Sequence, residues 1–531
     1  MNHEKLNVDR RTFLRQSAFF AGGLAVIEAG RPITSLAQQT DVRKRTSDSP
    51  SISRKFARWV AGLRYRDLPA AVVDRAKGLT LHALASALQG YQLPAGQEAV
   101  KLVLEEGENV RNGATILVEG LKATKGDAAF ANAELILAGG KWDTFRMLTH
   151  PGTSILPAAL AAAETERASG REFLAGLAAG YEVMERMAGD FIPTVMARGF
   201  HAGPVFGIFG AAVAAAKIMR LTEDQINDAI GLCVNLAAGN LESLGLREGP
   251  AARNAMLAVT LARLGHHGGE TALEGRAGLY HAYAGNNEGR LTYSFTGDTR
   301  TSMDKITAKL GEEWMLLETI YRIYSITGYN LAHVDVTAKL CDEHNIRYED
   351  VDRVEALVNW LETQYPSPAF PSRREDVGEP DTGSTRYYLA YGVVKRTYPM
   401  VPGAPDPPEV LELMKRVTII PSHQLTLFGP RITIFTKDGR SYTKQATGRE
   451  FMWNFEEEAR RIRGVIPGIP IPPARFEEII AMCRELDGQD QVVKLLELTV
   501  KSTSAINPVE RPAPAPLPKT SGSRSADHPL L

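Results

Sequence analysis

Cysteine is scarce in this chain of 531 residues, which has only three, Cys233, Cys341 and Cys483. An odd number at wide spacing argues against a disulfide framework of the kind that holds small secreted domains together. Free cysteine is one of the most frequently buried residue types. The sequence therefore predicts free thiols in the protein interior.

An excess of charge of one sign is also lacking. The 61 Lys and Arg residues nearly balance 62 Asp and Glu residues, and the formal net charge of -1 creates no field that would attract nucleic acid or an anionic membrane. No zinc-type Cys/His spacing occurs. Past the first forty residues, no apolar run is long enough to span a bilayer. The composition, 44% hydrophobic and 23% charged, is that of a globular protein long enough for more than one domain.

The first 37 residues have the pattern of an export signal. Arg10 and Arg11 precede a moderately apolar stretch from Ser17 to Ala29, and Ser35-Leu36-Ala37 supplies small residues where a signal peptidase cleaves. This order is typical of a twin-arginine signal. It predicts recognition by the twin-arginine export machinery, a mature chain from about Gln38, a periplasmic location and no membrane contact after the signal is removed.

The remaining chain divides into segments that differ in composition and hydrophobic periodicity. Residues 38–51 are polar and indicate a linker, whereas 52–295 carry one helical pattern after another. Residues 296–446 contain β-branched runs and indicate an α+β domain of ordinary size. Residues 447–505 are helical again, and the Pro/Ser-rich end at 506–531 is typical of disorder. The predicted fold class is mostly α, with a large helical domain and a smaller α+β domain.

The apolar spacing also predicts individual elements. Helices are expected at 68–90, 128–138, 154–168, 171–188, 204–219, 222–238, 250–264, 385–395 and 476–486. Strands are expected at 351–360, 417–420 and 431–435, the last followed by a hairpin turn at 437–440. Asp127 is placed to cap its helix, and Pro157 falls in the expected first turn of the next one.

Two histidines stand at predicted helix entrances. His150 precedes Pro151-Gly152, and His201 lies just before Gly203-Pro204. A helix N-terminus offers free N–H groups and a positive dipole end, which attracts a carboxylate and keeps an imidazole neutral. Two such imidazoles at one cleft would form a proton acceptor and donor pair. The alternative is that both are ordinary capping or loop histidines.

A series of short stretches resembles one family in order along the chain. The stretches are Phe56–Val60, Asp67–Pro69, Thr149–Gly152, Gly199–His201, Ala251–Asn254, Leu273–Gly275 followed by Gly278, Lys415–Val417 and Asp438–Arg440. They resemble, over about residues 52 to 500, the MmgE/PrpD family of 2-methylcitrate dehydratases, cis-aconitate decarboxylases and iminodisuccinate epimerases. The resemblance implies an all-helical domain with an α+β lid and a homodimer. It also implies chemistry next to a carboxylate, without a metal or organic cofactor.

The same resemblance implies roles for individual residues. His150 matches an active-site histidine, Thr144 a threonine that holds a carboxylate, and Asp143 the end of an acidic run whose first aspartate is Gly140 here. We therefore expect Asp143 and Thr144 to act beside His150 and His201.

Other positions depart from the family pattern. A family lysine is replaced by Leu244, the histidine three residues later by Arg247, and a second lysine by Arg322. Arginine keeps the charge but does not give up a proton, so Arg247 and Arg322 are expected to bind substrate carboxylates. Tyr329 and His333, in the helix after Arg322, are expected to line the site.

Three functional hypotheses remain open from the sequence. The first is a lyase or isomerase acting on a small di- or tricarboxylic acid by histidine acid/base chemistry. The second is an exported carboxylate-binding protein that lost catalysis, as the change at Leu244 suggests. The third is a hydrolase or other enzyme on the same fold, since a fold does not fix a function.

Overall fold

The computed structural model describes residues 49–107, 110–147, 149–243, 245–324, 326–363, 383–399, 405–464 and 468–501. The predicted export signal, almost all of the predicted linker, Leu244 and the C-terminal tail lie outside the described residues. The predicted domain boundaries stay a prediction, because contacts group Pro50–Leu531 into a single compact unit.

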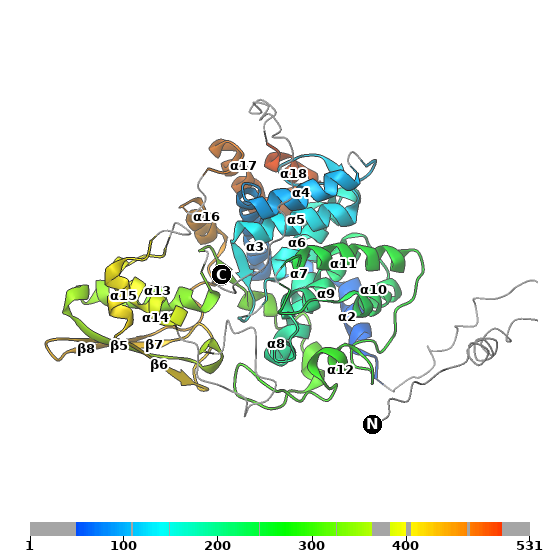
Figure 1. Ribbon diagram of the computed structural model, residues 1–531. Helices are drawn as coiled ribbons and strands as arrows, with labels where there is room; N and C mark the ends of the chain where they lie inside the picture. Colours follow the sequence, from blue (N-terminus) through cyan, green and yellow to red (C-terminus); the bar gives the residue numbers. More distant parts are fainter. Residues whose placement is uncertain are drawn as a thin grey trace, which may run out of the picture. The chain divides into compact units, whose positions relative to one another are not determined.

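Helices make up the first part of the described chain (Figure 1). They are α2 (Ile52–Gly62), α3 (Ala70–Gly90), α4 (Pro94–Glu106), α5 (Lys125–Gly139), α6 (Pro151–Thr165), α7 (Gly170–Ala188), α8 (Ile192–Met196), α9 (Ala202–Ile218), α10 (Glu223–Leu236), α11 (Glu248–Arg263) and α12 (Leu279–Ala284). Short 3₁₀ turns are η3 (Tyr65–Asp67), η4 (Gly189–Phe191), η5 (Met303–Thr307), η6 (Met315–Glu318), η7 (Tyr348–Asp350), η8 (Trp360–Thr363) and η10 (Leu486–Gly488).

Helix α9 is the centre of this helical part. Every residue of α9 except Lys217 is buried, because the helix is apolar on all sides and packs against α6, α7, α10 and α11. The close crossing of α7 and α9 depends on glycine: a Cβ added at Gly180 would lie 2.5 Å from the carbonyl oxygen of Gly210. Small residues thus allow α7 and α9 to cross closely.

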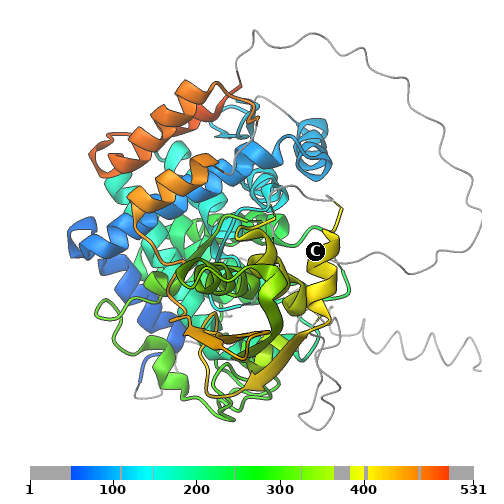
Figure 2. The same cartoon turned by 90° about the vertical axis from the view of Figure 1, so that its left-hand side faces the viewer.

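The α+β part contains a four-stranded sheet in the order β6-β5-β7-β8. The strands are β5 (Val351–Asn359), β6 (Val417–Ser422), β7 (Arg431–Thr436) and β8 (Ser441–Gln445). β5 runs parallel to β6, and the other pairs are antiparallel. Helices α13 (Gly328–Glu343), α14 (Gly383–Lys395) and α15 (Pro408–Met414) lie on one face of the sheet (Figures 1 and 2). α13 contacts β7 and β8, and α14 contacts β6.

The chain then returns to the first helices. Helices α16 (Phe455–Gly464) and α17 (Pro473–Arg484) contact α3, and α18 (Val493–Thr499) packs on α17. Two small antiparallel sheets complete the fold, β1 (Ala114–Thr115) with β2 (Lys122–Ala123) and β3 (Trp142–Thr144) with β4 (Ile320–Arg322). Within the described residues, no helix is long and apolar enough to cross a membrane.

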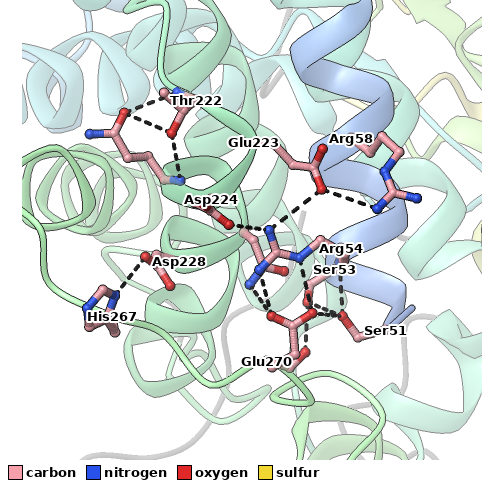
Figure 3. A network of polar contacts seen from close by, with 12 residues as sticks. Ser51, Ser53, Arg54, Arg58, Thr222, Glu223, Asp224, Asp228, His267 and Glu270 are labelled. Atoms are coloured by element: carbon pink, nitrogen blue, oxygen red, sulfur yellow. Dashed lines mark hydrogen bonds and ion pairs between the residues drawn. The ribbon is translucent and has the colours of Figure 1, made fainter. Parts of the chain in front are cut away.

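A polar network anchors α2 to the helical core (Figure 3). Arg54 forms ion pairs with Asp224 at 2.6 Å and Glu270 at 2.8 Å. Ser51 caps α2 by accepting from the backbone N–H of Arg54, and its hydroxyl donates to Glu270 at 2.8 Å. These contacts tie the first described helix to α10 and to the loop around residue 270.

The mostly α prediction is confirmed, and the predicted helices and strands form with small shifts at their ends. Two details were wrong. Thr124 caps α5 by accepting from the backbone N–H of Asp127, so Asp127 lies in the first turn. Helix α6 begins at Pro151, which takes the first position where a missing N–H costs nothing, so Pro157 lies inside the helix. The three cysteines are buried and free, as predicted.

Candidate active site

Three helix N-termini meet around two histidines and one arginine. His150 is the N-cap of α6, His201 of α9 and Arg247 of α11, and α9 packs against both other helices. The positive charges of Arg322 and Arg247, together with His201, act on His150. Each helix start adds a positive dipole end and backbone N–H groups. The predicted pair of histidines is therefore brought together in an electropositive environment.

The small β3–β4 sheet brings Arg322 to this group. Trp142 pairs with Arg322 across the two strands, and the guanidinium lies over the indole ring, 4.4 Å from its centroid. The centroid of the same Trp142 ring lies 4.6 Å from that of the His150 ring. A planar guanidinium stacks well on an aromatic face, so Trp142 holds Arg322 close to His150.

The hydrogen bonds of His150 fix its tautomer. Its Nδ1 lies 2.9 Å from the backbone carbonyl oxygen of Asp143, and the Thr144 hydroxyl is 3.2 Å from the same nitrogen. Because a carbonyl oxygen only accepts, Nδ1 carries the hydrogen and Nε2 keeps its lone pair. Burial of the ring and the nearby Arg322 hold the pKa of His150 well below its usual range. His150 is thus neutral, with Nε2 able to accept a proton.

His201 has the opposite arrangement. Its Nδ1 accepts from the backbone N–H of Gly203 at 3.2 Å, so the hydrogen of the neutral ring lies on Nε2. Arg247 Nη1, which can only donate, lies 3.2 Å from this Nε2. Burial, with Arg247 beside it, lowers the pKa of His201 to about 3. Two N–H groups therefore approach each other, and an oxygen anion placed next to both would accept from both.

The side chain of Asp143 forms hydrogen bonds with helices α6 and α7. Its buried carboxylate accepts from the backbone N–H of Gly152 at 2.9 Å and from the Tyr181 hydroxyl at 2.6 Å. The sequence predicted that N–H groups at the start of α6 would bind a substrate carboxylate, but the Gly152 N–H already donates to Asp143. Thr144 is fully buried, with its hydroxyl near His150.

Tyr329 and His333 lie deep inside the α+β part. His333 is fully buried, and its Nδ1 is 2.9 Å from Asn330 Oδ1 and its Nε2 3.3 Å from the carboxylate of the fully buried Glu362. The Tyr329 ring lies 6.0 Å from the His333 ring and is 1% exposed. His333 thus contacts Glu362, while the first residue of the same helix, Gly328, lies next to Thr144, where an added Cβ would be 3.8 Å from Thr144 Cγ2. The expected lining role of Tyr329 and His333 stays a prediction.

Glu248 was missed by the sequence reasoning. It is the first residue of α11 and is only 2% exposed. An acidic residue at a helix start is usually a solvated partner of the helix dipole, and nothing in Glu248-Gly249-Pro250 indicates burial. The burial comes from the packing of α11 against α9, which sequence periodicity does not reveal.

The buried Lys141 also interacts electrostatically with Arg322 and belongs to this charged group, whereas two other features of the described residues do not. No group of three or more His, Cys, Asp or Glu side chains there is arranged to hold a metal ion. A surface pocket of about 540 Å³ lies elsewhere, lined by residues of α3, α16 and neighbouring turns. Its cations already have carboxylate partners, since Lys77 pairs with Asp487 and Arg484 with Glu456.

Comparison with known proteins indicates one family. Residues 54–292 match the model of the MmgE/PrpD N-terminal domain. The comparisons support the MmgE/PrpD family for this chain. It is 25% identical over 433 residues to a cis-aconitate decarboxylase-like protein, oryM, of Aspergillus oryzae, covering 74% of this chain and 85% of that protein. It is 24% identical over 500 residues to a cis-aconitate decarboxylase of Aspergillus terreus, covering 86% of this chain and 98% of that protein. A human cis-aconitate decarboxylase is 26% identical over 288 residues, covering 50% of this chain and 58% of that protein.

Proposed function

We propose that the protein is a lyase that acts on a small di- or tricarboxylic acid at the carbon next to a carboxylate. Decarboxylation or dehydration ranks ahead of epimerisation, because the relatives are named cis-aconitate decarboxylases at 24–26% identity. The observation that carries the proposal is the opposite protonation of two neighbouring neutral imidazoles. His150 has a lone pair on Nε2, and His201 has a hydrogen there.

Arg247 and Arg322 bind the substrate carboxylates. Arg247 Nη1 and His201 Nε2 supply two hydrogens at one point, which suits one carboxylate oxygen. Arg322, held on Trp142, supplies a second cation for another carboxylate. Such anchoring fixes the reacting carbon between the imidazoles, and positioning of this kind contributes several kcal/mol to catalysis.

The chemistry follows from the charge that develops on the reacting carbon. Removal of a proton or loss of carbon dioxide leaves an electron pair beside a carboxylate. His150 accepts a proton, and His201 faces the carbon that must gain one. The three helix dipoles and two guanidinium groups stabilise the negative charge without reorganising.

The predicted setting of the enzyme extends the proposal. The α+β part would act as a lid that excludes water from the histidines, and the enzyme would work as a homodimer. The twin-arginine pattern at Arg10 and Arg11 supports export to the periplasm.

A carboxylate-binding protein without catalysis is the second candidate. The observation that favours it is the replacement of the family lysines by Leu244 and Arg322, which leaves anion binding intact but removes two proton donors. The same arginines would then hold a carboxylic acid for transport or sensing.

Proton NMR in heavy water separates the two candidates. The purified protein would be incubated with cis-aconitate, 2-methylcitrate, citrate and succinate, beside a His150→Gln variant. The exposed His344→Gln variant is the matched control for a histidine change outside the site. Loss of an α-proton signal, or a new alkene or decarboxylated product, is expected with the native protein and His344→Gln only. Line broadening of an acid without any chemistry would refute the lyase and favour the binding protein.

A further inference from the structure

The carboxyl group of Glu248 occupies space left by two glycines of α9. A Cβ added at Gly203 would lie 2.6 Å from Glu248 Oε1, and one at Gly207 would lie 3.5 Å from Oε2. Any side chain at Gly203 would therefore displace the carboxyl group. Oε2 is buried and has no hydrogen-bond partner among the described residues, and the same holds for the neighbouring Ser154 hydroxyl.

The same carboxyl group lies beside His201. The Cβ position of Gly203 is 3.1 Å from His201 Nδ1, so Glu248 Oε1 and His201 Nδ1 flank one point on α9. Nδ1 is the nitrogen that bears the lone pair, because the backbone N–H of Gly203 donates to it. A proton on Glu248 can therefore reach this lone pair, directly or through one water molecule, when it displaces the Gly203 N–H from Nδ1.

The surroundings of Glu248 favour its protonated form. Burial is the main cause that raises the pKa of Glu248 to about 8; the charges of Glu134 on α5 and Asp143 on β3 act in the same direction, and Arg247 opposes them. His201 is neutral at this pH and adds no opposing cation. The Thr153 hydroxyl, which also lies 2.5 Å from the His150 carbonyl oxygen, opposes this by favouring the carboxylate form of Glu248.

The two histidines and two arginines of the site hold no readily released proton. His150 and His201 are both neutral, arginine does not release a proton, and the family lysine position is Leu244. A substrate carbon left with an electron pair after decarboxylation nevertheless needs one proton. A neutral imidazole is far too weak an acid to give one unless its other nitrogen is protonated in the same step.

We propose that Glu248 is the proton store of this site and supplies its proton to the substrate through His201. The Glu248 O–H bond breaks and leaves a carboxylate, while an N–H bond forms at His201 Nδ1. The His201 Nε2–H bond breaks, its electron pair stays on the ring, and its proton forms a C–H bond with the electron pair of the substrate carbon. His201 ends neutral as the other tautomer. A proton from solvent then binds at Nε2 and the Nδ1 proton returns to the Glu248 carboxylate, which restores both groups. Since Glu248 acts through His201, it is a positioning residue, and the relay rests on the proposed lyase function.

Turnover of cis-aconitate by Glu248→Gln tests the relay. The amide keeps the shape but has no transferable proton, so kcat should fall by about 10²- to 10⁴-fold with KM changed only a few-fold. In the native protein kcat should fall as pH rises through about 8, and this fall should be absent from the variant. Glu134→Gln is the matched control, because its amide oxygen can still accept from the Gly249 N–H and should leave kcat within a few-fold. A Glu248→Gln enzyme with native kcat would overturn the proposal.

A second measurement does not depend on turnover. In protein labelled with ¹⁵N at histidine, the His201 ring signals, assigned with a His201→Gln variant, should shift as pH passes about 8 and stay constant in Glu248→Gln. A His201 signal that ignores Glu248 would overturn the relay. If it responds but cis-aconitate and the other acids are not turned over, the lyase function fails while the link between the two side chains stands. If Glu248→Gln kept the native kcat and Lys141→Met lost it, the relay would be overturned. The buried Lys141 would then be the proton source.

Discussion

His150 and His201 use the same ring atom in opposite ways. Nδ1 of His150 donates to the Asp143 carbonyl at 2.9 Å, whereas Nδ1 of His201 accepts from the Gly203 N–H at 3.2 Å. Both residues lie at helix starts, but only His201 uses Nδ1 to accept from a backbone N–H of the helix that it begins. The difference leaves one Nε2 with a lone pair and the other with a hydrogen, which is the requirement for an acid/base pair built from two identical side chains.

We expect Asp143 to support stability more than chemistry. Asp143→Ala would leave the Gly152 N–H and the Tyr181 hydroxyl buried without their acceptor and lower the free energy of unfolding by about 2–5 kcal/mol. Asp143→Asn keeps an acceptor for Gly152 and the backbone carbonyl that orients His150, so its cost should be about 1–2 kcal/mol. Urea unfolding measures both values, with Tyr181→Phe as the control for the single hydroxyl. A loss of kcat in Asp143→Asn as large as that in His150→Gln would place Asp143 in the chemistry.

Arg247 should control the affinity for carboxylates. Arg247→Met removes the guanidinium beside His201, so the Kd for cis-aconitate should rise about 10- to 100-fold, the value of a lost charge-assisted hydrogen bond. The pKa of His201 should also rise, because one of the two causes of its depression disappears.

Calorimetric titration measures the affinity change. Arg253→Met is the matched control, since Arg253 lies on the same helix but is exposed and pairs with Asp127 at 2.8 Å. Equal losses in the two variants would mean that Arg247 acts only through general positive charge.

The sequence predicted the helices around the site but not the packing between them. Pro151 and Gly203-Pro204 identify His150 and His201 as residues at helix starts, because proline and glycine leave a local signal. The contact of Arg247 with His201 joins residues 46 positions apart, and the burial of Glu248 depends on Gly203 and Gly207 of another helix. Such contacts between helices leave no periodic pattern in either segment. The contact of His333 with Glu362, from beyond strand β5, is another that the sequence did not indicate.

The ion network of Arg54 should stabilise the attachment of α2. Arg54→Ala removes three ion pairs, to Asp224, to Glu270 and, at 3.6 Å, to Glu223, and should lower the free energy of unfolding by about 1–2 kcal/mol, more than a single exposed pair. Arg58→Ala is the control, because its contact with Glu223 is longer, at 3.5 Å, and exposed, and should cost at most about 0.5 kcal/mol. Urea unfolding at low and high salt measures both, and the Arg54 effect should shrink as salt screens the charges. Identical costs would show that the network does not anchor the helix.

Acid should destabilise the protein through His201. The folded protein holds the pKa of this ring at about 3, whereas an unfolded chain has the ordinary value of 6.5. Between these values the unfolded state binds one more proton, so stability rises with pH and is lost as pH falls below about 6.5. His201 alone should therefore cost about 2 kcal/mol between pH 7 and pH 5. Unfolding free energies at the two pH values, compared between the native protein and His201→Gln, isolate this contribution. Because glutamine does not titrate, the variant should lose less stability than the native protein by that amount, and an equal loss would mean that His201 is not held neutral by the fold.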